Sequence, residues 1–139
     1  MAERQDLKYL RLALFLVGII FIFGIYTLVI VWPSGWAWHS GMSHSLPHYL
    51  QMILGVYATL GVFLVMASRD PLRHLSLIWF TVWSSAVHAA IMAVQSFTEH
   101  QMGHLWGDVA ALLLVAIVLS TLVLSAGLKQ PAPDPAGTR

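Results

Sequence analysis

Cysteine is absent from this 139-residue chain, and charged residues make up only 9% of it. Without a thiol, the chain forms no disulfide, no thiolate metal site and no cysteine nucleophile. Soluble domains carry roughly 25% charged residues. With 58% hydrophobic residues, the chain has too little polar surface to cover a water-facing globule. The composition therefore predicts one domain whose solvent is the lipid bilayer.

Several functional motifs are also missing from the sequence. It contains no glycine-rich phosphate loop, no Rossmann fingerprint and no serine in a nucleophile-elbow context. No basic aromatic patch indicates nucleic acid as a partner. No lysine lies within the apolar runs, which argues against a retinal-type Schiff base. These absences favour a protein without enzymatic activity.

Four apolar runs are long enough to cross a membrane, for which a helix needs about 20 mostly apolar residues. They predict an all-α, four-transmembrane-helix bundle in a single membrane domain at residues 1–128. The proline-rich stretch 129–139 is predicted to be a disordered tail. The predicted helices cover residues 10–32, 46–68, 72–97 and 104–128.

The basic residues indicate how these helices cross the membrane. All seven Lys and Arg residues lie at the N-terminus, between the second and third helices, or in the tail. The positive-inside rule then predicts an N-in/C-in topology with a short cytoplasmic hairpin at 69–74. So short a link predicts that the second and third helices are antiparallel neighbours, with Asp70 as cap and Pro71 in the first turn. Loops 33–47 and 98–104 then face outward.

Both outward loops carry histidines, so side chains that are distant in sequence share one membrane face. In a last helix that begins early, His100, His104 and Asp108 are spaced i, i+4, i+8 on one stripe. Neutral imidazole and carboxylate suit zinc or copper, and the methionines of the same loops shift the preference toward copper. Helices position ligands better than loops do. We therefore predict core ligands, which the helices anchor, and auxiliary ligands, which they do not. The core ligands are His48, His104 and Asp108, and the auxiliary ligands are His44 and His100.

The same histidines have two other interpretations. Histidine and tryptophan are both at home in the headgroup region, and no strict motif such as H-E-x-x-H is present. The histidines are then interfacial residues that bind no metal. Alternatively, they form a proton-linked switch, since imidazole titrates near physiological pH. All three interpretations remain open on the sequence alone.

One further histidine, His88, lies near the middle of the third apolar run. Polar residues at helical spacings share its side of the predicted helix. Such a stripe is costly against lipid, so it is predicted to face the bundle interior, and His88 becomes a candidate cofactor-binding residue. The alternative is a neutral histidine that bonds to a serine hydroxyl or carbonyl of a neighbouring helix. The other members of the stripe are Thr81, Ser84, Ser85 and Gln95.

These observations leave three functions open. The first is a non-transporting membrane protein that holds copper or zinc at its outer face. The second is an accessory or structural subunit of a larger membrane complex or homo-oligomer, which contacts lipid, pigment or quinone and has no chemistry of its own. The third is an enzyme or quinone-binding module that uses His88 and the tyrosines. Haem is disfavoured, because the only candidate second ligands, His48 and His104, lie nearer the surface.

Three stretches of the chain are characteristic of a known family: "GVYATLGVFL", "SLIWFTVWSSAVHAAIMAVQ" and "GHLWGDV". Over about residues 8–125 the sequence resembles a family of small bacterial four-helix integral membrane proteins of unknown function. The resemblance implies the four-helix architecture and a place in the bacterial inner membrane. The loops that the basic residues place outward are then periplasmic or extracellular. It implies no activity, substrate or catalytic residue.

Overall fold

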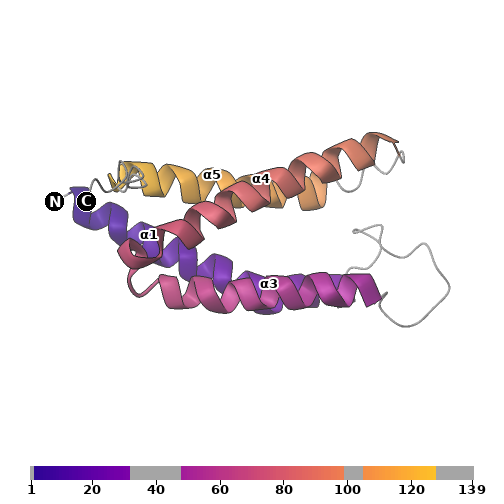
Figure 1. The fold of residues 1–139 in the computed structure, drawn as a ribbon, viewed down its shortest axis with the longest axis horizontal. Helices are drawn as coiled ribbons and strands as arrows, with labels where there is room; N and C mark the ends of the chain where they lie inside the picture. The colour runs from indigo at the N-terminus through magenta and orange to yellow at the C-terminus, as the bar shows by residue number, and fades with distance from the viewer. Residues whose placement is uncertain (1, 32–47, 99–104, 128–139) are drawn as a thin grey trace, which may run out of the picture.

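The computed structural model describes residues 2–31, 48–98 and 105–127, and these residues form helices joined by short turns, without a strand (Figure 1). The predicted all-α class is therefore confirmed. The predicted tail and most of both outward loops lie outside the described residues. The elements are α1 (Ala2–Ile19), η1 (Ile20–Gly24), α2 (Ile25–Val31), α3 (His48–Ala67), η3 (Pro71–His74), α4 (Leu75–Thr98), η4 (Leu105–Val109) and α5 (Ala110–Ser125).

Three helical segments are long and apolar enough to cross a membrane: Gln5–Thr27, Pro71–Phe97 and Leu105–Ser125. Helix α3 has 20 residues, which at about 1.5 Å per residue is roughly 30 Å long. Its apolar part, Gln51–Ala67, is shorter than the other three segments. The fold is thus a bundle of membrane-spanning helices, in which the spanning role of α3 stays a prediction.

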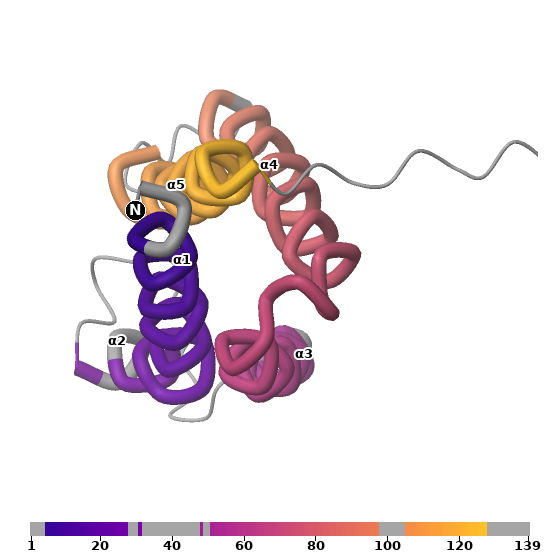
Figure 2. The backbone as a smooth tube through the Cα atoms, turned by 90° about the vertical axis from the view of Figure 1, so that its left-hand side faces the viewer, coloured from indigo at the N-terminus to yellow at the C-terminus, as the bar shows by residue number. Residues whose placement is uncertain are grey.

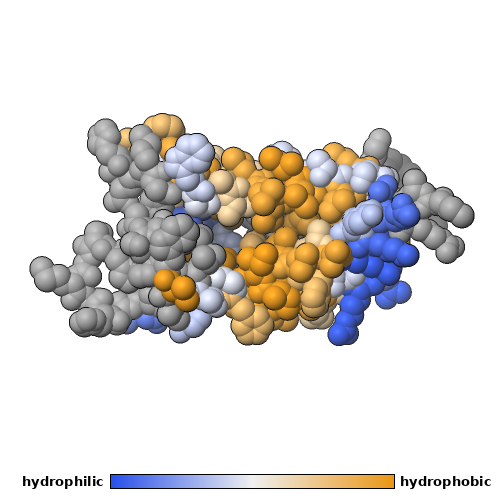
Figure 3. Space-filling model, turned by 180° about the vertical axis from the view of Figure 1, so that it is seen from behind, coloured by the Kyte–Doolittle hydropathy of each residue, from blue (hydrophilic) through white to orange (hydrophobic). Residues whose placement is uncertain are grey.

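The first helix begins at Ala2, well before the apolar run that starts at residue 10. Lys8 and Arg11 therefore lie on the helix, with exposed side chains. The start of α1, the link between α3 and α4, and the end of α5 all lie at one end of the bundle (Figure 1). On the face shown in Figure 3, hydrophilic residues gather at this end and apolar residues cover the middle. This arrangement is the one that the N-in/C-in prediction requires.

The link between α3 and α4 differs in detail from the prediction. Pro71 does occupy the first turn, but Asp70 makes no side-chain hydrogen bond that caps the helix. Its carboxylate instead pairs with Nε of Arg73 at 3.0 Å, one turn later. The carboxylate is thus turned toward the guanidinium and not toward the N–H groups of the first turn. The two side chains are largely exposed.

The second and third helices are not the close neighbours that the short link predicts. Helix α1 packs against α3 and α5, and α4 packs against α5. From their link, α3 and α4 diverge, and they touch at few points (Figures 1 and 2). The reason is that α3 packs more extensively against α1 than against α4. The bundle is therefore two helix pairs, α1–α3 and α4–α5, joined at one end.

A pair of glycines explains the close packing of α1 on α3. A Cβ atom on Gly18 would lie 2.8 Å from the carbonyl oxygen of Gly61. A Cβ atom on Gly61 would lie 2.6 Å from the carbonyl oxygen of Gly18. Only hydrogen fits at both positions, so the two backbones touch. Small residues drive such contacts in lipid, where hydrophobicity does not bring helices together.

Candidate functional site

A hydrogen bond joins α3 to α4 across the space into which they diverge. The hydroxyl of Tyr57 lies 2.5 Å from Nδ1 of His88. The two rings are tilted by 33°, with centroids 5.9 Å apart. Both side chains are half-buried. A polar contact between helices is worth about 1 kcal/mol in a membrane protein, so it contributes to holding the two helix pairs together.

The pair lies far from the outer ends of α3 and α4. Tyr57 follows His48, the first residue of α3, by nine positions, or roughly 14 Å at about 1.5 Å per residue. His88 precedes Thr98, the last residue of α4, by ten positions, or roughly 15 Å. Along the helix axes, both residues therefore lie about half the thickness of a hydrocarbon core, which is about 30 Å, from these helix ends.

Phe21 packs against the pair from the first helix. Its side chain is 5% exposed, and its ring meets that of Tyr57 edge-on, with centroids 5.0 Å apart and planes at 89°. Edge-to-face aromatic pairs add about 0.5–1.5 kcal/mol beyond the area that they bury. Phe21 thus fixes the orientation of the Tyr57 ring, and with it the direction of the hydroxyl toward His88.

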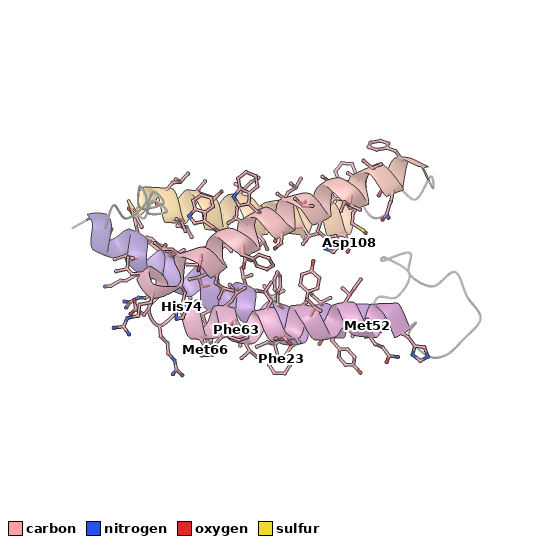
Figure 4. All side chains as sticks on the ribbon, viewed as in Figure 1. Phe23, Met52, Phe63, Met66, His74 and Asp108 are labelled. Atoms are coloured by element: carbon pink, nitrogen blue, oxygen red, sulfur yellow. The ribbon has the colours of Figure 1, made fainter. Side chains whose placement is uncertain are left out.

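Asp108 approaches the pair from the last helix. Its side chain is only 7% exposed. Figure 4 shows it near the N-terminal end of the α5 segment, on the side that faces α3. Its carboxylate interacts electrostatically with both Tyr57 and His88. Asp108 has at least one further interaction. A buried carboxylate at this depth is costly and is retained where it serves other polar groups.

The two residues that flank the pair both lie in π-helical turns. Phe21 belongs to η1, and Asp108 belongs to η4. A π-turn carries one extra residue per turn, which rotates the side chains around it, and such turns often occur at functional sites. In two separate helical segments, the geometry thus changes from α to π at the residues that interact with the pair. The sequence carries no signal that predicts either turn.

The second ring nitrogen of His88, Nε2, has no hydrogen-bond partner among the described residues. A neutral imidazole has one nitrogen that donates and one that accepts. If the Tyr57 hydroxyl donates to Nδ1, then Nε2 carries the proton and donates. If Nδ1 donates to the hydroxyl oxygen, then Nε2 accepts. In both arrangements His88 presents one polar atom to a further partner.

The predicted polar stripe faces inward on the part of α4 that precedes His88 and not on the part that follows it. Thr81 and Ser85 are buried, and Ser84 is half-buried. The hydroxyls of Thr81 and Ser84 donate to carbonyl oxygens of their own helix, at 2.9 Å and 3.2 Å. Gln95 departs from the expected orientation, because its side chain is exposed. The neighbouring Ser96, which is 1% exposed, faces the interior instead.

The interhelical hydrogen bond that the sequence offered as an alternative for His88 does occur. Its partner is a tyrosine hydroxyl, where a serine or a carbonyl was expected. Sequence reasoning named the tyrosines only as a group, in the quinone-binding alternative, and did not single out Tyr57. The available signal was its place in the middle of an apolar run, since a buried tyrosine hydroxyl usually finds a partner.

The predicted metal ligands are described only in part. His48 is the first residue of α3 and is exposed, whereas Asp108 is buried. His44, His100 and His104 lie outside the described residues. Within the described ranges, no group of three histidine, aspartate or glutamate side chains is arranged to hold a metal ion. The copper or zinc site therefore stays a prediction.

The apolar helices and the polar pair between them define a small helical integral membrane protein. Residues 4–138 match the model of DUF6632, a family of unknown function, and the chain belongs to that family. The expected membership in an uncharacterised family is thus confirmed. Searches of curated proteins and of solved structures found no match.

Proposed function

We propose that this protein binds a lipid-soluble molecule inside the membrane, at the Tyr57–His88 pair. The observation that carries the proposal is the half-buried His88, whose Nε2 has no partner among the described residues. This atom lies roughly 15 Å from the end of α4, in a segment long and apolar enough to cross a membrane, so we expect a ligand to reach it from the lipid. An unsatisfied polar group in hydrocarbon costs several kcal/mol, so a ligand that pairs with it gains that energy.

The helix arrangement supports access from the bilayer. Helices α3 and α4 diverge from their link and touch at few points (Figure 2), and we expect a ligand to reach the pair from the side between them. The protein acts by binding, as an accessory protein of the membrane or of a larger membrane complex. The proposed location is the bacterial inner membrane, with both termini cytoplasmic and loops 33–47 and 98–104 in the periplasm.

Extraction of the purified protein tests this proposal. The protein is purified in mild detergent, extracted with organic solvent, and the extract is analysed by mass spectrometry. We expect a molecule near one per protein that is lost in His88→Ala and kept in Thr59→Val. Thr59 is a matched control on α3, since its exposed hydroxyl donates only to Gly55 of its own helix. Identical extracts from all three proteins would contradict the proposal.

A metal at the outward face is a second candidate. It is favoured by the position of the buried Asp108 at the same end of the bundle as His48, the start of α3. Copper or zinc would be held by His48, His104 and Asp108, with His44 and His100 as auxiliaries, as the sequence predicts. Metal analysis after copper and zinc loading checks this candidate. Equal metal content in the wild type and in His48→Ala/His104→Ala would exclude it.

A further inference from the structure

We propose that the lipid-soluble ligand is a quinone, whose ring oxygen hydrogen-bonds to Nε2 of His88. This inference rests on the function proposed above and names its ligand class. Quinones dissolve in the middle of the bilayer, and their headgroup is an aromatic-sized ring with two oxygen atoms. Both properties match a polar pair that lies far from the ends of its helices and packs against the ring of Phe21.

The hydrogen-bond chemistry of the pair fits both redox forms of such a molecule. With the Tyr57 hydroxyl donating to Nδ1, Nε2–H donates to the carbonyl oxygen of a quinone. With Nδ1–H donating to Tyr57, Nε2 accepts from the hydroxyl of a quinol. A single nitrogen thus recognises either form, and Tyr57 holds the ring in place for both.

The surroundings of His88 suit a flat ring. Phe21 and Tyr57 form an edge-to-face pair beside it. One turn before His88, α4 carries Ser84 and Ser85, whose side chains are too small to cover the imidazole. The Ser84 hydroxyl is engaged with its own helix and does not compete for Nε2. The aromatic pair therefore offers a packing face beside His88, next to two small serine side chains.

Other lipid-soluble molecules fit these features less well. A carotenoid-type pigment has a hydrocarbon chain that cannot pair with Nε2 at this depth. A phospholipid carries its polar groups near the membrane surface, whereas His88 lies roughly 15 Å from the end of α4. Bis-histidine haem needs a second histidine at the same depth. Of the other described histidines, His48 begins α3 and His74 ends η3, at opposite ends of the bundle.

Binding of a short-tailed quinone tests the inference. Decylubiquinone is titrated into the protein in detergent, and quenching of tryptophan fluorescence reports binding. Trp79 and Trp83 lie on α4 within about two and a half turns of His88. We expect saturable quenching whose Kd rises about tenfold in His88→Ala, in keeping with a lost buried hydrogen bond. Thr59→Val should leave the Kd unchanged. Decylbenzene, which has the same tail and no carbonyl, should not compete.

A second variant keeps the test decisive if His88→Ala does not fold. Tyr57→Phe retains the ring on Phe21 and removes only the hydroxyl, and it should raise the Kd about threefold. Equal quenching in the wild type and in both variants would overturn the quinone assignment. So would full competition by decylbenzene.

The extraction experiment separates this inference from the proposed function. A His88-dependent molecule in the extract that is not a quinone, together with no binding of decylubiquinone, would overturn the inference alone. No His88-dependent molecule and no binding of decylubiquinone would overturn both.

Discussion

The two halves of the bundle are packed differently. In the half near the link between α3 and α4, which we call the hairpin half, all four helices meet around completely or almost completely buried aliphatic side chains. In the other half, the site half, α3 and α4 separate and the interior holds Tyr57, His88 and Asp108. Among the members of the hairpin half are Leu10, Leu14, Leu64, Ile78, Leu119 and Val123.

The difference teaches how a small membrane protein keeps polar groups in its interior. The hairpin half supplies packing that holds the two helix pairs together. The site half is then free to place polar groups between helices that barely touch. The site half also has a small buried cluster of Ala89, Met92, Val109 and Leu112. Tyr57 packs against this cluster and against that of the hairpin half, so it connects the two halves. Stability and ligand binding are therefore expected to respond to substitutions in different halves.

The largest effect is expected from Leu64→Ala in the hairpin half. Leu64 is completely buried where α3 meets the other helices. Its truncation leaves a cavity, and the free energy of unfolding should fall by about 2–5 kcal/mol. Thermal unfolding in detergent measures the loss. Val56→Ala on the same helix is the control, because Val56 is 68% exposed and should change stability little.

Gly61→Ala should follow in size, because it separates α1 from α3. The added Cβ would lie 2.6 Å from the carbonyl oxygen of Gly18 and 2.8 Å from Cγ1 of Ile22. Backbone must move, at a cost of about 1–3 kcal/mol in the free energy of unfolding. Gly55→Ala is the matched control, since a Cβ there meets nothing within 4 Å. Equal stability of the two variants would show that the glycine contact is not needed.

Tyr57→Phe should change stability less than either core substitution. It removes one interhelical hydrogen bond, which is worth about 1 kcal/mol between membrane helices. Helices α3 and α4 should also become more mobile relative to each other. Distance measurements between spin labels at the exposed positions Val56 and Val87 report this motion. An unchanged distance distribution would mean that packing alone positions the two helices.

The smallest effect is expected from Asp70→Asn at the link. The Asp70–Arg73 ion pair is exposed, with Arg73 at 83% exposure, and such surface pairs contribute about 0–1 kcal/mol. Melting temperatures in low and high salt measure its contribution. A loss as large as that of Leu64→Ala would show that the link, and not the aliphatic core, holds the hairpin half together.

Part of the site could be predicted from the sequence. His88 stands out because a titratable residue within an apolar run is rare and needs a partner. The partner itself could not be predicted, because Tyr57 and His88 are 31 positions apart. The orientation of Gln95 could not be predicted either, since a small change in helix rotation decides which of Gln95 and Ser96 faces inward.

Local hydropathy by itself determined the helices of this protein. In hydrocarbon a backbone must satisfy its own hydrogen bonds, so an apolar run of sufficient length becomes a helix whatever surrounds it. Only the tertiary structure decided which helices touch. Association in lipid depends on the shape of facing surfaces, here the contact of Gly18 with Gly61 and the π-turns that carry Phe21 and Asp108. These features bring side chains from the other three helices to the pair of Tyr57 and His88.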